Sequence, residues 1–165
     1  MSLGRSKKAD KPRRSAYDKA LALLARREQS RHELHERLAR DGYPRDEVRG
    51  ALDRLAGDGY QDDARFAEMM VRARIASGYG PQRIRAELRT HRIGDAFVER
   101  HLAEADVDWG AAARAQLHRR YGDAPVADYA ERAKRAQFLL RRGFDAATVN
   151  TVTRADVDDA ADHED

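Results

Sequence analysis

The sequence predicts an all-α protein, an elongated and curved solenoid of three tandem three-helix repeats with about nine helices. Two observations carry this prediction. Apolar residues recur at one spacing in three successive stretches, and no stretch alternates convincingly between apolar and polar residues at the period of a β-strand. A row of thin repeats also suits 165 residues that are 41% hydrophobic and 37% charged, because that balance disfavours one large core.

The repeat is defined by five apolar positions that span a turn between two helices. The first copy has Leu34, Leu38, Tyr43, Val48 and Leu52. The second copy, shifted by 50 residues, has Ile84, Leu88, Ile93, Val98 and Leu102. The third, shifted from the first by 101, keeps Leu139, Phe144 and Val149 and has Arg135 and Thr153 at its outer positions. A degenerate last copy is expected where an array needs a cap.

The first repeat is predicted to cover residues 15–58. An amphipathic helix is expected at about 16–27. Ser30 and Glu33 have the spacing of a capping box that starts the second helix, and Gly42 ends that helix. Pro44 opens a third helix that closes at Gly57 and Gly59.

The second repeat is predicted over residues 59–106. Asp62 or Asp63 is expected to cap its first helix. The stretch from Gly78 to Pro81 breaks the chain, and Pro81 begins the next helix. Asp95 is expected to cap the third.

The third repeat, residues 107–154, begins near Asp108 and contains a longer helix predicted at about 125–142. Gly143 ends that helix, and Asp145 caps a last short one. The glycine and proline links between repeats are expected to leave room for hinge motion.

The two ends of the chain carry opposite charge. Residues 1–14 have a net charge of +5 and residues 155–165 a net charge of −6, within a total of +3. Neither end has apolar periodicity, so a disordered basic arm and a disordered acidic tail are predicted. Two interpretations of the arm stay open, a phosphate-binding segment and a solvated tail.

Composition also narrows the functional classes. The absence of cysteine excludes disulfides, thiolate metal sites and thiol nucleophiles. No signal peptide or membrane-length apolar run is recognised, so the cytoplasm is the expected location. Arginine outnumbers lysine 27 to 5, which fits either genomic bias or recognition of phosphates and carboxylates.

No catalytic or metal-binding motif is convincing. His32 and His35 are three residues apart, whereas the zinc-protease motif needs four. The pair Asp62–Asp63 is explained by helix capping, and His101 lies on the apolar stripe of its helix. A non-enzyme without a cofactor or metal is predicted.

Arginine and lysine cluster on three predicted helices of the second and third repeats. The candidate binding residues are Arg72, Arg74, Arg83, Arg85, Arg89, Arg92, Arg132, Lys134, Arg135, Arg141 and Arg142. Arg85, Arg89 and Arg92 are spaced as one stripe, which suits a phosphate backbone or an acidic protein groove. An ordinary solvated helix face is the alternative. No helix has the Asn, Gln and Arg mixture that recognises base edges, so any DNA binding is expected to be weakly sequence-specific and salt-sensitive.

Two segments resemble the signatures of a known family. The stretch Gly59-Tyr-Gln-Asp-Asp-Ala-Arg-Phe-Ala67 and its continuation through Arg74, Gly78, Gly80-Pro81, Arg83-Ile84 and Glu87-Leu88 resemble the RecX family. The stretch from Arg132 to Phe144 resembles that family's C-terminal signature. Departures are Gln61 in place of an aliphatic residue, Phe66 in place of tyrosine and Tyr79 in place of lysine. The resemblance covers about residues 16–154.

The resemblance implies a modulator of RecA, the bacterial recombinase. It implies three tandem three-helix repeats that lie in the groove of the RecA–single-stranded DNA filament, bridge protomers and block filament growth. Lower ATPase, strand-exchange and coprotease activities would follow, with effects on DNA repair and the SOS response. Expected partners are RecA and DNA, single-stranded and also double-stranded, with no membrane. A free-standing DNA-binding protein that acts by occupying DNA is the alternative, and a helical adaptor for another partner is a weaker third.

The turn residues within these segments are not assigned to binding. Gly59, Tyr60, Asp62, Asp63, Gly78, Pro81, Gly143 and Phe144 are expected to be structural, because they fix caps and turns.

Overall fold

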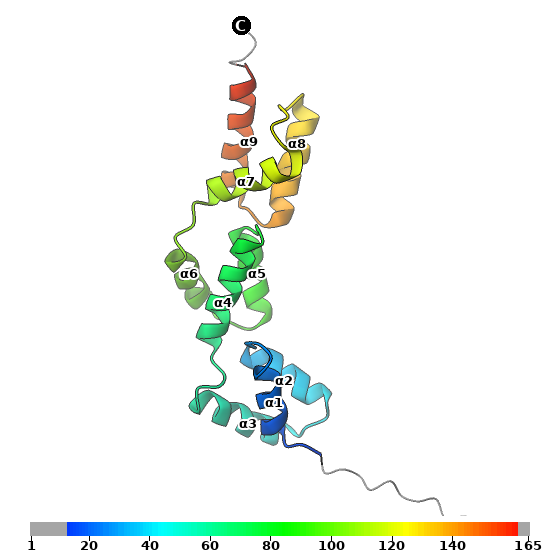
Figure 1. The fold of residues 1–165 in the computed structure, drawn as a ribbon, viewed down its shortest axis with the longest axis vertical. Helices are drawn as coiled ribbons and strands as arrows, with labels where there is room; N and C mark the ends of the chain where they lie inside the picture. Colours follow the sequence, from blue (N-terminus) through cyan, green and yellow to red (C-terminus); the bar gives the residue numbers. More distant parts are fainter. Residues whose placement is uncertain (1–12, 162–165) are drawn as a thin grey trace, which may run out of the picture. The chain divides into compact units, whose positions relative to one another are not determined.

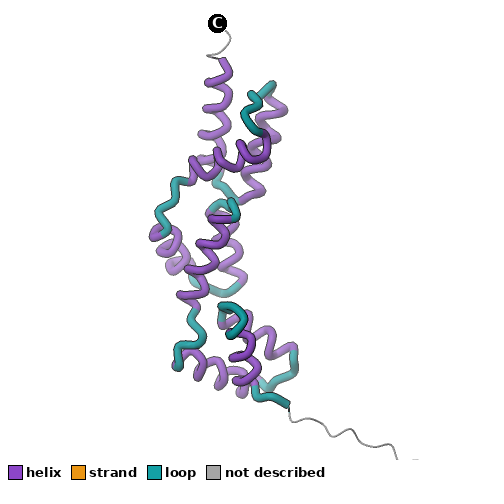
Figure 2. The backbone as a smooth tube through the Cα atoms, viewed as in Figure 1, coloured by secondary structure: helices purple, strands orange, loops and turns teal. Residues whose placement is uncertain are grey.

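The computed structural model describes the backbone of residues 13–161 and the side chains of residues 13–154. Within that part of the chain there are nine α-helices and no strand, which confirms the predicted all-α repeat fold (Figures 1 and 2). The chain divides into two compact units, a first unit up to Asp62 and a second unit from Asp63 onward.

The first unit contains α1 (Ala16–Leu24), α2 (Arg31–Arg40) and α3 (Arg45–Gly57). Helix α3 packs against both α1 and α2. The core lies between the three helices and is formed by Ala16, Ala20, Leu34, Leu38, Val48, Ala51, Leu52 and Leu55. The apolar positions of the first copy of the repeat therefore form this core, with Tyr43 half-buried at its edge.

Hydroxyl caps and a glycine turn set the helix boundaries in this unit. The Ser15 and Ser30 hydroxyls accept hydrogen bonds from the amides of Asp18 and Glu33, at 3.1 and 3.0 Å. Gly42, at φ +84°, ends α2 in the left-handed conformation that glycine adopts without strain. The predicted serine cap of α2 is confirmed.

Gly50 offers a simple stability prediction, because it lies inside α3 and a methyl group added there would meet nothing within 4 Å. Replacing it with alanine is expected to raise the free energy of unfolding by about 0.5–1 kcal/mol, since glycine is a poor helix former. Urea unfolding followed by circular dichroism measures the change, and an unchanged or lower stability would contradict the expectation.

The second unit contains two three-helix groups. The first comprises α4 (Asp63–Ala76), α5 (Pro81–Thr90) and α6 (Asp95–Glu104), whose core includes Phe66, Met70, Ile84, Leu88, Val98 and Leu102. The second comprises α7 (Trp109–Tyr121), α8 (Tyr129–Arg142) and α9 (Ala146–Ala161), packed around Ala113, Leu117, Leu139, Phe144, Val149 and Val152. Helix α7 lies across α8 and α9 (Figure 1).

Several predicted boundaries differ from those in the structure. Helix α8 begins at Tyr129, not near Pro125, because the Asp128 carboxylate caps it by accepting from the Glu131 amide at 2.8 Å. Gly94 takes the cap position of α6, and Asp95 is its first helical residue. The Asp145 cap of α9 is confirmed, since its carboxylate accepts from the Thr148 amide at 2.7 Å.

Helix α9 continues to Ala161, well past the predicted end of the third repeat at residue 154. The acidic segment predicted to be disordered is therefore helical over residues 155–161. Residues 162–165 and residues 1–12 of the basic arm lie outside the described residues.

Backbone hydrogen bonds join the two groups of the second unit. The amides of Gly80 and Gln82 donate to the carbonyls of Arg142 and Gly143, both at 2.8 Å. A methyl group on Gly80 would lie closer than 3.0 Å to the backbone of Gly143 and Phe144. Because these glycines permit close approach, the contact forms a fixed joint between the two helical groups.

The degenerate third repeat keeps the register of the other two. Arg135 and Thr153, at its outer positions, are 4% and 2% exposed, so both lie in the places that aliphatic residues take in the first two repeats. The Thr153 hydroxyl donates to the Val149 carbonyl at 2.8 Å, which satisfies it within the helix. The third repeat thus differs from the others in the type of residue at these two positions and keeps the same pattern of buried positions.

Candidate partner-binding surface

The turn residues of the RecX-like segments have structural surroundings. Gly59 and Gly78 have φ of +77° and +80°, and Pro81 is the buried first residue of α5. Gln61, which departs from the aliphatic residue usual in the RecX signature, is 4% exposed and donates to the Gln29 carbonyl at 3.4 Å. Its amide therefore has a partner inside the first unit.

One predicted cation, Arg74, is held by a carboxylate on the neighbouring helix. Its guanidinium donates two hydrogen bonds to Glu87, at 2.7 and 2.5 Å, and so joins α4 to α5. The hydrogen bonds from Arg74 lower the pKa of Glu87, while partial burial opposes them. The same contact raises the pKa of Arg74.

The Arg74–Glu87 pair predicts a pH-dependent stability. The folded-state pKa of Glu87 lies below its ordinary value of 4.5, so the pair stabilises the fold above that pH. This contribution is lost as the pH falls through the lowered folded pKa. Replacing Glu87 with glutamine is therefore expected to lower the urea midpoint at pH 7 and to have little effect near pH 3. An equal loss at both pH values would contradict the ion-pair explanation.

Two further cations of the predicted arginine stripe connect α5 to α6. Arg85 donates to both carboxylate oxygens of Glu99, at 2.5 and 2.9 Å, and Arg89 donates to Asp95 at 2.8 Å. Hydrogen bonds from these arginines lower the pKa of Glu99 and Asp95. Two of the three charges in the stripe are thus neutralised within the second unit, and Arg92 is the member that no described carboxylate compensates.

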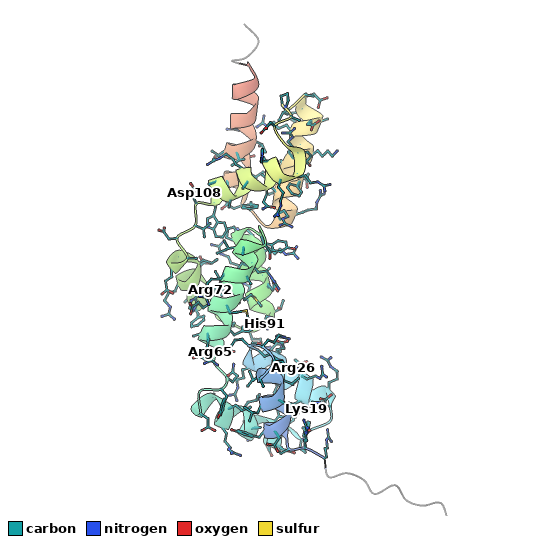
Figure 3. All side chains as sticks on the ribbon, viewed as in Figure 1. Lys19, Arg26, Arg65, Arg72, His91 and Asp108 are labelled. Carbon is teal, nitrogen blue, oxygen red and sulfur yellow. The ribbon has the colours of Figure 1, made fainter. Side chains whose placement is uncertain are left out.

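The remaining paired candidates differ in burial. Arg72 on α4, labelled in Figure 3, is exposed and lies 3.4 Å from Glu68. Arg135 is buried, donates to the Ala124 carbonyl at 2.8 Å and to Glu131 at 3.3 Å, and lies over the Tyr121 ring. Its guanidinium is used inside the third repeat, so it contributes little surface to a partner.

Tyr79 is contacted by two cations. The guanidinium carbons of Arg83 and Arg142 lie 4.1 and 4.2 Å from its ring centroid. Arg142 also donates to the Ser77 carbonyl at 2.6 Å, which adds to the joint between the two helical groups. Tyr79 replaces the lysine usual in the RecX signature, so one positive charge is replaced by a ring that holds two guanidinium groups.

Six candidates have no carboxylate within ion-pair distance among the described side chains. One of them, Arg142, is half-buried and donates to the Ser77 carbonyl. The other five are Arg83, Arg92, Arg132, Lys134 and Arg141. Arg132 is half-buried and the other four are exposed. They are the predicted cations whose charge remains available to a partner.

Arg92 has an unusual backbone conformation. Its φ is +57°, in the left-handed region, where the equivalent positions of the other repeats hold Gly42 and Gly143. An arginine in this conformation costs about 1 kcal/mol relative to glycine. The chain therefore keeps an exposed cation where its own repeats favour glycine.

The Arg92→Gly variant is expected to be more stable than the wild type by about 1 kcal/mol, because the backbone strain is relieved. The same variant is expected to bind its partner more weakly if the cation is part of the surface. Urea unfolding and a binding titration on one preparation measure both effects. A variant that gains stability and keeps full binding would remove Arg92 from the surface.

Some exposed cations on α7 were not among the residues predicted from sequence. Arg114, Arg119 and Arg120 are exposed and have no ion-pair partner among the described side chains. They lie on a helix that carries none of the RecX-like motifs, and they are not assigned to the candidate surface. The described residues contain no cluster of acidic and histidine side chains able to hold a metal ion. They also contain no helix long and apolar enough to span a membrane.

The fold and these side chains define a helical repeat protein with unpaired surface cations. Comparison of the sequence with models of known protein families identifies the class of protein more specifically. The models of the first, second and third RecX three-helix domains match residues 16–55, 62–102 and 106–153. The chain belongs to the RecX family of regulatory proteins.

Comparisons with individual proteins support the same family. The chain is 46% identical over 141 residues to a regulatory protein RecX of Xanthomonas oryzae pv. oryzae, covering 86% of this chain and 87% of the relative. It is 47% identical over 143 residues to that of Halorhodospira halophila, covering 86% and 89%. A crystal structure of a regulatory protein RecX matches with a TM-score of 0.71 at 25% identity, covering 84% of this chain and 70% of that one. RecX from Lactobacillus salivarius has the same fold, with a TM-score of 0.67 at 24% identity, covering 85% and 93%.

Proposed function

We propose that this protein regulates RecA by binding the RecA–single-stranded DNA filament, in its groove or at its end, and stopping filament extension. ATPase, strand-exchange and coprotease activities of RecA decrease as a result, which modulates DNA repair and the SOS response. Membership of the RecX family is the observation that carries the proposal.

The distribution of charge supports a role in binding and suggests which residues make contact. We assign the contact to the five unpaired candidates, Arg83, Arg92, Arg132, Lys134 and Arg141, which meet acidic RecA surface or DNA phosphate. Arg85 and Arg89 contribute less, because a partner must first displace Glu99 and Asp95. The protein acts without a cofactor and without catalysis of its own, in the cytoplasm.

Paired charge reversals test this assignment. The double variant Lys134→Glu with Arg141→Glu changes two exposed, unpaired cations on α8. It is expected to raise the concentration of this protein needed for half-inhibition of RecA ATPase by at least about tenfold, because two charge-assisted contacts with the partner are lost. The matched control is Arg114→Glu with Arg119→Glu on α7, which changes the net charge equally. Equal loss in the two variants would indicate general electrostatic attraction and would contradict the assignment.

A further inference from the structure

The first unit contains a basic groove whose charge the second unit does not reproduce. The groove lies between the C-terminal end of α1 and the outer face of α2 and measures about 370 Å³. We call it the repeat-1 groove. Its lining residues are Leu23, Arg26, Arg27, Gln29, Glu33, Arg37 and Arg40.

A corresponding groove exists one repeat later, which allows a direct comparison. In the second unit it lies between α4 and α5 and is lined by Arg74, Tyr79, Arg83, Ala86, Glu87 and Thr90. A shift of 50 residues aligns Gln29 with Tyr79, Glu33 with Arg83, Arg37 with Glu87 and Arg40 with Thr90. The two grooves are therefore the same feature of the three-helix repeat.

The charges of the two grooves differ. In the second unit, the two guanidinium groups of the lining face one carboxylate, and the Arg74–Glu87 pair bridges the helices. In the repeat-1 groove, four guanidinium groups face the single carboxylate of Glu33. The residue aligned with Glu87 is itself a cation, Arg37, so the carboxylate that the second unit has at this position is absent here.

Only part of the excess charge is compensated within the protein. Arg27 pairs with Glu33, and Arg37 lies 3.5 Å from Asp41. Arg26 and Arg40 are exposed, and no described carboxylate lies within ion-pair distance of either. Arg26 is labelled in Figure 3. The groove thus presents two free guanidinium groups, Arg26 from the turn after α1 and Arg40 from the end of α2, beside two others that are paired with acids.

The lining indicates the chemistry of the ligand. Leu23 is the one apolar residue of the described lining, so the groove offers little for the apolar face of a protein helix. Guanidinium groups match phosphate oxygens in a bidentate manner, and a flexible polyanion presents phosphates to several of them together. We propose that the repeat-1 groove binds the phosphodiester backbone of nucleic acid, with Arg26 and Arg40 as its principal contacts. This site is separate from the candidate surface of the second unit.

Salt-dependent binding of a fluorescent oligothymidine to the full chain tests the proposal. For single strands, each phosphate contact contributes about 0.7 to the slope of log affinity against log salt. The double variant Arg26→Glu with Arg40→Glu is expected to lower the slope by about 1.4 and to weaken binding at every salt concentration. The control, Arg45→Glu with Arg49→Glu, changes the net charge of the same unit equally through exposed α3 residues outside the groove lining. It is expected to keep the wild-type slope.

Three results would overturn the proposal. The first is an unchanged slope in the groove variant, and the second is an equal decrease in the control. The third is a groove variant that binds oligothymidine as well as the wild type does but no longer binds a polyglutamate peptide. That result would assign the groove to an acidic protein segment. Circular dichroism of both variants establishes that they are folded, and since all four substituted residues are exposed, native helicity is expected.

Discussion

Replacing Gly80 with alanine is expected to lower the free energy of unfolding of the second unit by about 1–3 kcal/mol, the combined net value of two backbone hydrogen bonds. The new methyl group would lie closer than 3.0 Å to the backbone of Gly143 and Phe144. Because neither neighbour is the flexible end of a side chain, the two helical groups must separate. The bonds from Gly80 and Gln82 to the carbonyls of Arg142 and Gly143 are then lost.

Urea unfolding of the Gly80→Ala variant, followed by circular dichroism and by Trp109 fluorescence, measures this effect. Trp109 packs against both cores of the second unit, and its ring lies 6.5 Å from that of Phe144. The two signals are expected to separate in the variant and to coincide in the wild type. Gly50→Ala is the matched control, because its methyl group meets nothing within 4 Å. A variant within about 0.5 kcal/mol of the wild type would contradict the fixed joint.

Replacing Arg135 with glutamate is expected to destabilise the second unit by about 3–5 kcal/mol, which is the usual cost of leaving a buried charge without its partner. The substitution places a second carboxylate beside Glu131 and leaves the Ala124 carbonyl without its donor. RecA inhibition is expected to fall in parallel, as a consequence of unfolding. Charge reversal at Arg135 therefore reports on the fold of the third repeat.

The Arg135→Leu variant distinguishes the effect of losing the charge from the effect of losing the packed side chain at this position. Leucine restores the aliphatic residue that Leu34 and Ile84 provide in the other repeats. Replacing a buried ion by an apolar residue of similar volume is often close to neutral, so a change below about 1.5 kcal/mol is expected. Equal destabilisation by leucine and glutamate would show that the Ala124 and Glu131 hydrogen bonds, and not charge reversal, dominate.

The repeat was predictable from sequence because its signal is apolar spacing, which burial enforces directly. The positions from Leu34 to Leu52 and from Ile84 to Leu102 line the cores as expected, and even the polar Arg135 and Thr153 keep their buried places. Boundaries were less predictable where neighbouring residues can each serve as the cap. Asp128 starts α8 four residues later than expected, and Asp95 gives the α6 cap position to Gly94.

The candidate site was less predictable than the fold, because pairing is a property of tertiary structure. Arg85, Arg89 and Arg92 share one helical spacing, yet α6 supplies acids to the first two only. The repeat register places Arg135 at a core position, so its burial could be predicted from the sequence. Its basic neighbours Arg132 and Lys134 instead favoured the interpretation that it belongs to an exposed cluster. The role of Gly80 depends on a backbone more than 60 residues away, which no local pattern reveals.

The most direct test of RecA regulation is single-stranded-DNA-dependent ATP hydrolysis by the cognate RecA, with this protein added in amounts too small to coat the DNA. We predict strong inhibition under these conditions, because a protein that caps a filament or lies in its groove acts on many RecA protomers at once. Inhibition that begins only when the protein saturates the DNA would contradict direct action on the filament and would identify a DNA-binding protein that competes with RecA for its substrate.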